Sequence, residues 1–356
     1  MRTDFPKSPQ LRLGWLVVSI GTVCLPLALA ILSTSCVTSG REVKPKTPSP
    51  IVWPTPPDAP RISWLRNIST PGDVGMTPST WNKVVGFVTG ESPEHQNLDK
   101  PFGITVDETG TVYVTDTGNN SVICLDLNHK EWRRWRTAGK TRFLAPVSLA
   151  RRQGVFYVAD SELAQVLAFN DKGDEIFTVS KPLQRPTGVA LNGELLFVVD
   201  SQLHAVLAFD LGGKLKFQFG TRGTAPGEFN YPTHINSDSA GHLLVTDAMN
   251  SRVQVFDAKG TFISQIGKAG DVPGHFGRPK GVAVDGFGHV YVVDAMFDNI
   301  QIFDLSGKLL LNFGEGGTKP GQFGVPAGIA VGPDNKIYVA DSYNHRVQVF
   351  QYIGAP

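Results

Sequence analysis

The sequence predicts an all-β protein, a six-bladed β-propeller of four-stranded antiparallel blades. The first observation behind this prediction is a unit that occurs six times and opens with a proline: Pro101, Pro146, Pro186, Pro232, Pro279 and Pro326. The second is an apolar run that ends in an aspartate in every unit: Asp116, Asp160, Asp200, Asp247, Asp294 and Asp341. Successive aspartates lie 40 to 47 residues apart, a period typical of propeller blades.

The last unit shows the strands of one blade most clearly. Residues 328–331 (GIAV), 336–341 (KIYVAD) and 346–350 (RVQVF) are rich in β-branched and aromatic residues and are separated by turn residues. Other units add a fourth run, for example 309–314 (LLLNFG). We call the four strands a, b, c and d. Because one such meander cannot bury both of its faces, we expect six of them to pack around a common axis.

The first 36 residues have the composition of an export signal. Basic residues precede an apolar run over 13–32, and small residues then lead to Cys36. The arrangement resembles a bacterial lipoprotein signal in which Cys36 is lipidated, except that Ser33 stands where such signals prefer leucine. Two alternatives stay open. Residues 28–30 (ALA) are compatible with ordinary cleavage, and the apolar run is long enough to remain as a membrane anchor.

Residues 37–60 are rich in proline, which predicts an extended tether, and residues 61–356 are assigned to the propeller. The stretch 61–69 (RISWLRNIS) has the composition of a strand but precedes every repeat, whereas the sixth unit has no strand d before Pro356. Pairing the two would close the ring and remove two open sheet edges. Between this closing strand and the repeats over 101–350, the stretch 77–90 predicts one short helix that starts with a threonine cap followed by proline.

The order of the strands decides which loops share a face. In a meander the b–c turns and the d–a connections lie at one end of each blade, which we call the loop-rich face. The a–b and c–d turns lie at the other end, which we call the short-turn face. Long connections such as 221–234 (TRGTAPGEFNYPTH) belong to the loop-rich face, so we expect function there.

Four short motifs in the units resemble the NHL repeat family. They are P-x-G-[IV]-[AT]-V-D, [VI]-Y-V-[AT]-D, N-[HNS]-R-V-Q-V-F and a connection of the form F-G…P-G-x-F-G, and the resemblance covers residues 101–350. It implies the six-bladed fold. It implies no single function, because the family includes lyases, relatives of sugar-lactone hydrolases, RNA-binding modules, protein-interaction platforms and uncharacterised bacterial exported proteins. The signal-like N-terminal segment favours the exported group.

The strand-end aspartates and one histidine are the polar residues that stand out within the repeats. Since every blade has its aspartate, we interpret the six aspartates as structural acceptors for the b–c turns that follow them. Two residues after the proline, four units have glycine and one has serine, but the fourth unit has His234. We expect His234 at the channel mouth on the loop-rich face. Basic residues of that face can attract an anionic ligand or an acidic partner. The candidate binding residues are His234, Arg185, Arg222, Tyr231, Arg278 and Lys280.

The sequence therefore predicts an exported, lipid-anchored and monomeric module of the cell envelope, which binds a protein or a small anionic ligand. A secreted or periplasmic protein and an N-terminal transmembrane anchor are the alternatives for its location. A formal charge of +1 and few aromatic residues among the loop charges argue against nucleic-acid binding. The alternative function is a lactonase- or lyase-type enzyme that uses the channel mouth.

The sequence predicts no catalytic residue, metal ligand or cofactor. A zinc site needs three converging protein ligands, and no other unit has a histidine that matches His234. A calcium or zinc ion in the channel stays open as an alternative. Cys124, the one cysteine within the repeats, is expected to be a buried apolar residue.

Overall fold

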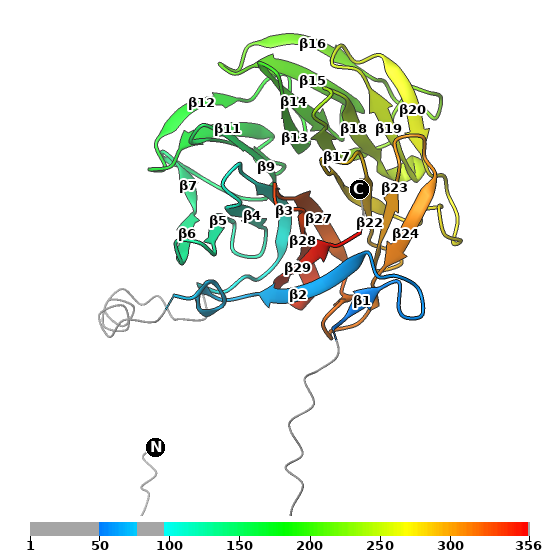
Figure 1. Cartoon of the computed structure of the whole chain (residues 1–356). Coiled ribbons are helices and arrows are strands. Elements are labelled where there is room, and N and C mark those ends of the chain that lie inside the picture. Colours follow the sequence, from blue (N-terminus) through cyan, green and yellow to red (C-terminus); the bar gives the residue numbers. More distant parts are fainter. Residues whose placement is uncertain (1–49, 77–95, 355–356) are drawn as a thin grey trace, which may run out of the picture. The chain divides into compact units, whose positions relative to one another are not determined.

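The computed structural model describes residues 50–76 and 96–354, and these form a six-bladed β-propeller (Figure 1). The predicted fold class is therefore confirmed. The predicted signal over 1–36, which includes Cys36, and the predicted helix over 77–90 lie outside the described residues.

Every inner strand, strand a, begins at the repeated proline. These strands are β3 (Pro101–Val106), β9 (Pro146–Arg152), β13 (Pro186–Asn192), β17 (Pro232–Ser237), β21 (Pro279–Val284) and β27 (Pro326–Val331). Every strand b ends at the repeated aspartate. These are β4 (Val112–Asp116), β10 (Val155–Asp160), β14 (Leu195–Asp200), β18 (Leu243–Asp247), β22 (Val290–Asp294) and β28 (Lys336–Asp341).

Strands c and d complete each blade toward the outside. Strands c are β5 (Ser121–Asp126), β11 (Gln165–Asn170), β15 (Ala205–Asp210), β19 (Arg252–Phe256), β23 (Asn299–Phe303) and β29 (Arg346–Tyr352). Strands d of the first five blades are β6 (Glu131–Trp135), β12 (Glu175–Val179), β16 (Leu215–Phe219), β20 (Phe262–Ile266) and β24 (Leu309–Phe313).

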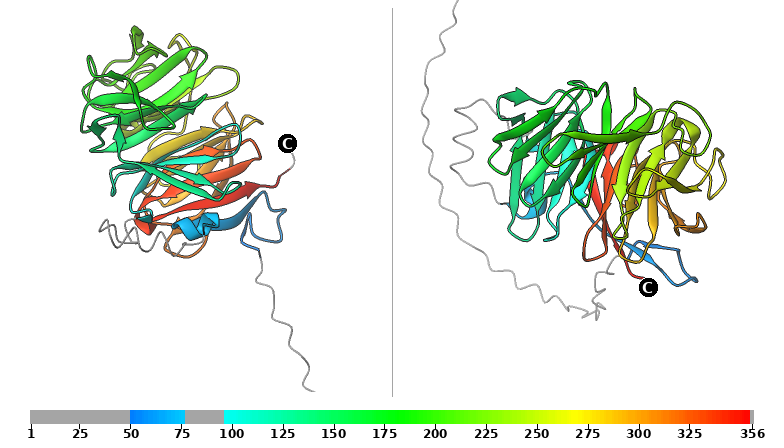
Figure 2. Two further views of the ribbon diagram at one scale, coloured as in Figure 1. Left: turned by 90° about the vertical axis from the view of Figure 1, so that its left-hand side faces the viewer. Right: turned by 90° about the horizontal axis from the view of Figure 1, so that it is seen from above.

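The sixth blade is closed by the N-terminal strand, as the sequence predicts. Strand β2 (Ile62–Ile68) pairs antiparallel with β29 and takes the place of strand d. Figure 2 shows β2 (blue) alongside β29 (red). A further short strand, β1 (Val52–Trp53), pairs with β2, so this sheet has five strands. Strand β1 falls in the last part of the stretch that we interpreted as a tether, and the sequence analysis did not foresee it.

Short elements occupy the turns and connections. The single-turn helix η1 (Pro71–Val74) follows β2, and the Asp73 carboxylate accepts hydrogen bonds from the amide and the hydroxyl of the N-cap residue Thr70, at 2.8 and 3.0 Å. Two similar turns, η3 (Ala248–Asn250) and η4 (Ser342–Asn344), form b–c turns. The remaining pairs are β7 (Thr137–Ala138) with β8 (Thr141–Arg142) and β25 (Glu315–Gly316) with β26 (Gln322–Phe323).

The core of the propeller lies between neighbouring blades. Within the described residues, six clusters of buried apolar side chains occupy the six interfaces of the ring. The apolar residue near the end of strand c is fully or almost fully buried in every blade: Leu125, Phe169, Phe209, Phe256, Phe303 and Phe350. Each blade therefore buries one face against each of its neighbours, and the stability of the ring depends on its closure.

We expect Ile68→Ala, in the closing strand, to lower the free energy of unfolding by about 2–5 kcal/mol, because Ile68 is fully buried against the first and sixth blades. The matched control is Leu65→Ala in the same strand, where the side chain is 41% exposed and the change should stay within about 0.5 kcal/mol. Urea unfolding of the two variants measures the difference. Equal losses would show that β2 does not complete the core.

Candidate functional site

The centre of the propeller is narrow at the level of the repeated glycine. A Cβ atom added to Gly328 would lie 2.3 Å from the carbonyl oxygen of Phe102 in the next inner strand, and one on Gly103 would lie 2.6 Å from that of Val147. The same holds for Gly281, at 2.6 Å from the carbonyl oxygen of Ala327. The inner strands thus approach one another too closely for any side chain at these positions.

Two aromatic rings from opposite blades stack across the channel. Phe102 belongs to the first blade and His234 to the fourth, and their ring centroids lie 5.8 Å apart at an angle of 21°. The ammonium group of Lys280, from the fifth blade, lies 5.5 Å from the centroid of the Phe102 ring, which places it in range of a cation–π contact. Because the first and fourth blades face each other in a ring of six, this stack spans the axis.

His234 is buried and has no partner for its ring nitrogens. His234 is 9% exposed, and neither its Nδ1 nor its Nε2 makes a hydrogen bond to any described residue. Burial, with a smaller effect from the charge of Lys280, lowers the pKa of His234 to about 3. The imidazole is therefore neutral at physiological pH, with one nitrogen as donor and one as acceptor.

Lys280 is itself partly desolvated. Burial, followed by the charge of Arg278, lowers the pKa of Lys280 to about 8. The nearby carboxylate of Asp298 acts in the opposite direction, and burial raises its own pKa above the usual range. The two groups form no ion pair within 4 Å among the described residues, so Lys280 faces the Phe102 ring rather than a counter-ion.

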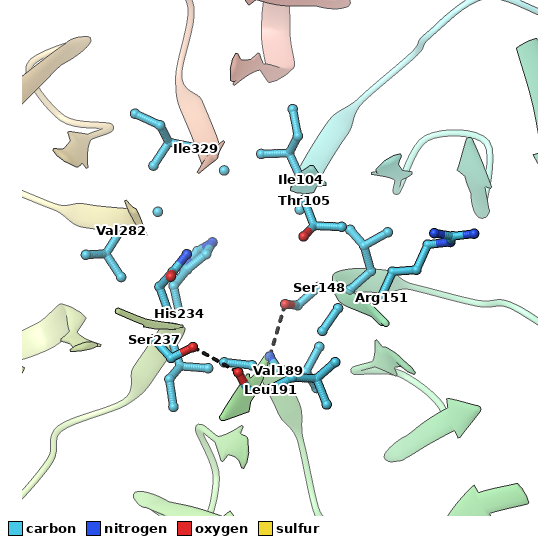
Figure 3. A pocket seen from close by; sticks show the side chains of 18 of the residues that line it. Ile104, Thr105, Ser148, Arg151, Val189, Leu191, His234, Ser237, Val282 and Ile329 are labelled. Atoms are coloured by element: carbon cyan, nitrogen blue, oxygen red, sulfur yellow. Dashed lines mark hydrogen bonds between the residues drawn. The ribbon is translucent and has the colours of Figure 1, made fainter. Parts of the chain in front are cut away.

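A cavity of about 230 Å³ lies on one side of the Phe102–His234 stack. Thr105, Ser148, His234 and Ser237 contribute polar atoms to its lining, and Figure 3 shows their side chains around it. The lining runs from the glycine level along the inner strands to Glu108, in an exposed a–b turn. The cavity therefore opens toward the short-turn face, away from the loops.

The structure does not bring the other candidate residues to this cavity. Arg185, Arg222 and Arg278 are exposed on the loop-rich face and are absent from the lining, as are Tyr231 and Lys280. Tyr231 packs its ring against His204, whose Nδ1 accepts a hydrogen bond from the Tyr231 amide. Our expectation that His234 points to the mouth on the loop-rich face differs from the structure, because Phe102, a large residue one position after its proline, stacks on the imidazole.

The strand-end aspartates are fully buried and connect three parts of each blade. Asp116 accepts hydrogen bonds from the amides of Gly118 and Asn119 in the b–c turn, at 3.1 Å each. It also accepts hydrogen bonds from the amides of Asp99 and Lys100, the two residues before the proline. The second set of contacts was missed by the sequence analysis, although the constant proline–aspartate pair was a usable signal.

The proline and the aspartate face each other in the sheet. Pro101 pairs with Asp116 and Pro326 with Asp341, and the other four blades repeat this register. Proline lacks an amide hydrogen, so it is tolerated at the first residue of a strand. The aspartate carboxylate accepts hydrogen bonds from the amides that precede the proline, and so it directs the incoming connection into the inner strand.

Arginine and glutamine of the R-V-Q-V-F motif hold the loops of the loop-rich face. Arg346 donates from Nε to Asp341 at 2.7 Å and from Nη2 to the carbonyls of Lys319 and Gln322. Gln348 donates to the same Gln322 carbonyl at 2.6 Å. Arg252 and Gln254 repeat these contacts in the fourth blade. In the fifth blade Gln301 alone makes the corresponding contact, to the His275 carbonyl. The long connections before the fourth, fifth and sixth blades are thus fixed to their blades, which makes this part of the loop-rich face a rigid surface.

Three b–c turns place large apolar side chains on this rigid surface. The residue two positions after the aspartate is Met249, Met296 or Tyr343 in the fourth, fifth and sixth blades, and these are 63%, 65% and 63% exposed. The equivalent residues of the other blades are Gly118, Glu162 and Gln202. We call Met249, Met296 and Tyr343 the apolar crescent. This crescent was not among the predicted site residues, because the b–c turns were interpreted as features of the repeat.

The described residues supply neither a metal cluster nor a membrane helix. In 50–76 and 96–354, no group of three or more His, Cys, Asp or Glu side chains is placed to hold a metal ion. The same residues contain no helix that is long and apolar enough to span a bilayer. Cys124 is buried, and burial raises the pKa of its thiol to about 12.

Comparison with known families agrees with the architecture. NHL repeats match residues 98–125 and 323–350, and a family described as a 6-bladed beta-propeller matches residues 237–314. The chain thus contains NHL repeats and folds as a propeller with six blades. The matched segments include the first and last blades, which also carry the Phe102 and Arg346 contacts described above.

Solved structures with the same fold include two lyases and a protein of unknown function. A streptogramin B lyase is similar with a TM-score of 0.53 and 16% identity, over 71% of this chain and 93% of that chain. A protein of unknown function from Bacteroides thetaiotaomicron VPI-5482 has a TM-score of 0.57 and 17% identity, over 71% of this chain and 70% of that one. A catalytically inactive variant of virginiamycin B lyase from Staphylococcus aureus, solved with quinupristin, has a TM-score of 0.53 and 16% identity, over 71% and 95% of the two chains. At these identities the likeness shows the fold alone.

We expect Gly328→Ala to cost about 1–3 kcal/mol of stability, because the new methyl group would press on the Phe102 carbonyl, which strand β3 holds in place. The matched control is Gly286→Ala in an a–b turn, where no atom lies within 4 Å of the added Cβ. Thermal unfolding compares the two. If both variants unfold at the wild-type temperature, the inner strands are not in the tight contact described.

Proposed function

We propose that this protein is an exported, lipid-anchored binding module that holds an acidic protein segment with apolar side chains on its loop-rich face. The observation that supports this proposal is the apolar crescent, whose three members occupy equivalent positions in three consecutive blades and are each more than 60% exposed. Large apolar side chains grouped on a rigid surface are a common feature of protein-binding sites. Methionine suits such a site because its flexible, polarizable side chain adapts to a partner.

The charge of the same face favours an acidic partner. Arg222 and Arg278 are exposed in the connections that precede the fourth and fifth blades, and Lys100 lies 6.0 Å from the ring centroid of Tyr343. Basic groups around an apolar centre match the usual anatomy of an interface, in which a polar rim surrounds an apolar core. The charges would accelerate encounter and select the partner, while the crescent would supply most of the affinity.

An enzyme of the lactonase or lyase type is the weaker alternative. A histidine that acts as a general base is normally oriented by a hydrogen bond to its second ring nitrogen. Neither nitrogen of His234 has such a partner among the described residues, and a pKa of about 3 makes the ring a poor base at neutral pH. The lyases with the same fold are too distant in sequence to transfer an activity.

We expect the double variant Met249→Ser with Met296→Ser to lose partner capture from envelope extracts by about tenfold or more, since the loss of two buried apolar contacts is worth more than the 1.4 kcal/mol of a tenfold change. The variant Arg222→Glu with Arg278→Glu should reduce capture mainly at low salt, because exposed charges act over about 10 Å at 0.1 M salt. Quantitative co-purification measures both effects, and mass spectrometry shows whether the partner contains an acidic segment.

The control for both variants is a charge reversal on the short-turn face, Lys214→Glu with Lys259→Glu, at exposed residues of two c–d turns. Melting temperatures should be similar in all three proteins, since these side chains are exposed. If the control loses the partner and both loop-rich variants keep it, the partner binds to the short-turn face and the proposal is wrong.

We expect lipidation at Cys36. Cells grown with radiolabelled palmitate should label the wild-type protein, and Cys36→Ser should abolish the label. The cysteine follows an apolar run and precedes a proline-rich stretch, the layout of a tethered lipoprotein. Equal labelling of the two proteins, or absence of label from both, would contradict the proposed anchor.

A further inference from the structure

The cavity below the Phe102–His234 stack is a second site, separate from the loop-rich face. We infer that it binds a small uncharged polyhydroxy compound of monosaccharide size, which enters from the short-turn face. Three features support this: the stack ends the cavity on the side of the loops, the lining offers both donors and acceptors, and no charged side chain belongs to the inner part of the lining.

The stack closes the cavity on the side of the loops. Phe102 and Lys280 lie next to His234 but are absent from the lining, whereas His234 belongs to it. The lining continues in the opposite direction, to Glu108 and Arg152 near the a–b turns. A ligand can therefore reach His234 from the short-turn face, and a partner on the apolar crescent would not compete with it.

The polar groups of the lining have capacity for hydrogen bonds that the protein does not use. Ser148 Oγ accepts a hydrogen bond from the Val189 amide at 3.1 Å, which leaves its own hydrogen free to donate. Ser237 Oγ donates to the Leu191 carbonyl at 2.9 Å, which leaves its lone pairs free to accept. His234 adds one donor and one acceptor, both without a partner among the described residues. Hydroxyl groups, which donate and accept at once, match this set.

An unsatisfied histidine in the middle of a fold needs an explanation. A buried polar group without a hydrogen bond costs about 1–3 kcal/mol. Serine occurs in the second blade, and glycine in the other four blades, where the fourth has His234. A ligand that makes hydrogen bonds to both imidazole nitrogens would account for His234, which the propeller fold does not require at this position. Ordered water is the competing occupant, because a polar cavity of this size holds water readily.

Charge selects an uncharged ligand. The imidazole is neutral, and the Arg151 guanidinium points away from the cavity (Figure 3), where it contacts Asp107 at 3.0 Å and Asp171 at 3.0 Å. Arg152 donates to the carbonyl of Gly193 and lies near the entrance. The Lys280 ammonium lies 5.5 Å from the centroid of the Phe102 ring and is not part of the lining, so an anion at the inner end would contact no cation, and an ammonium group would contact no carboxylate. Burial of an unpaired charge is expensive, so both are disfavoured.

Size and apolar walls agree with a sugar or a cyclic polyol. A volume of about 230 Å³ corresponds to roughly eight water molecules at about 30 Å³ each, similar to a five- or six-carbon polyol. Val189, Leu191, Val282 and Ile329 provide apolar walls between the polar groups. Sugars present C–H surfaces as well as hydroxyl edges, and specific sites combine apolar walls with a few placed polar groups.

The test uses the purified full chain and ligand-observed NMR with titration of D-glucose, D-galactose, D-mannose, xylitol and myo-inositol. D-Gluconate and D-glucosamine serve as charged probes of the same size. At least one neutral probe should bind, and neither charged probe should bind as well. His234→Phe keeps an aromatic ring for the stack but removes both nitrogens, and it should weaken binding about tenfold or more, because the two hydrogen bonds from the imidazole to the ligand are lost.

Two further variants make the test decisive. Asn236→Leu places a larger apolar side chain in the cavity and should abolish binding, whereas Leu65→Ala, on the outer closing strand, should leave the affinity unchanged. The melting temperature of His234→Phe should not fall, because the histidine nitrogens make no hydrogen bonds to lose. If no neutral probe binds, if a charged probe binds better, or if His234→Phe binds as well as wild type, the inference is overturned. A crystal soaked with the neutral probes that shows water alone in the cavity also overturns it.

Discussion

The close approach of the inner strands is the constraint on which the rest of the propeller depends. Backbone carbonyls of one inner strand reach the glycine of the next strand. A Cβ atom on Gly328, for example, would lie only 2.3 Å from the carbonyl oxygen of Phe102. Six strands can meet around one axis only if most of them have no side chain at this level. The proline and aspartate of each blade then fix where the strand enters this ring, since the buried carboxylate binds the amides that precede the proline. We infer that the tight contact between the inner strands, and not the outer strands, sets how neighbouring blades align along the axis.

Closure by β2 follows from the same logic. A ring that is tight at its centre cannot tolerate a gap between the first and sixth blades, because each blade buries a face against two neighbours. Strand β2 supplies the missing edge, and Ile62 and Ile68 at its two ends are fully buried in different interface clusters. The N-terminal part of the chain therefore belongs to the last blade. This arrangement removes the open edge that would otherwise invite pairing with another chain.

The sequence predicts repeats far better than it predicts exceptions. Periodic prolines, aspartates and β-branched runs were enough to predict the six blades and their strand order, because each signal occurs six times and local propensity agrees with burial. The closing strand could be predicted because the sixth unit has no strand d of its own. The candidate site could be predicted only in part. The departure at His234 was visible in the sequence, but its environment depends on Phe102, which lies in the opposite blade and more than a hundred residues away. The pattern along one strand contains no information on which side chains meet across the axis.

The Phe102–His234 stack also separates two different environments of the propeller. Above it, the arginine and glutamine of the repeat motif bind the long connections to the blades, so that Met249, Met296 and Tyr343 project from a rigid surface. Below it, hydroxyl groups and an unpartnered imidazole line a cavity with its own entrance. A rigid apolar surface suits a macromolecule, which needs area, whereas a narrow polar cavity suits a small molecule, which needs hydrogen bonds. The two rings separate these environments, so a small molecule proposed for the cavity and a partner proposed for the loop-rich face would not contact each other.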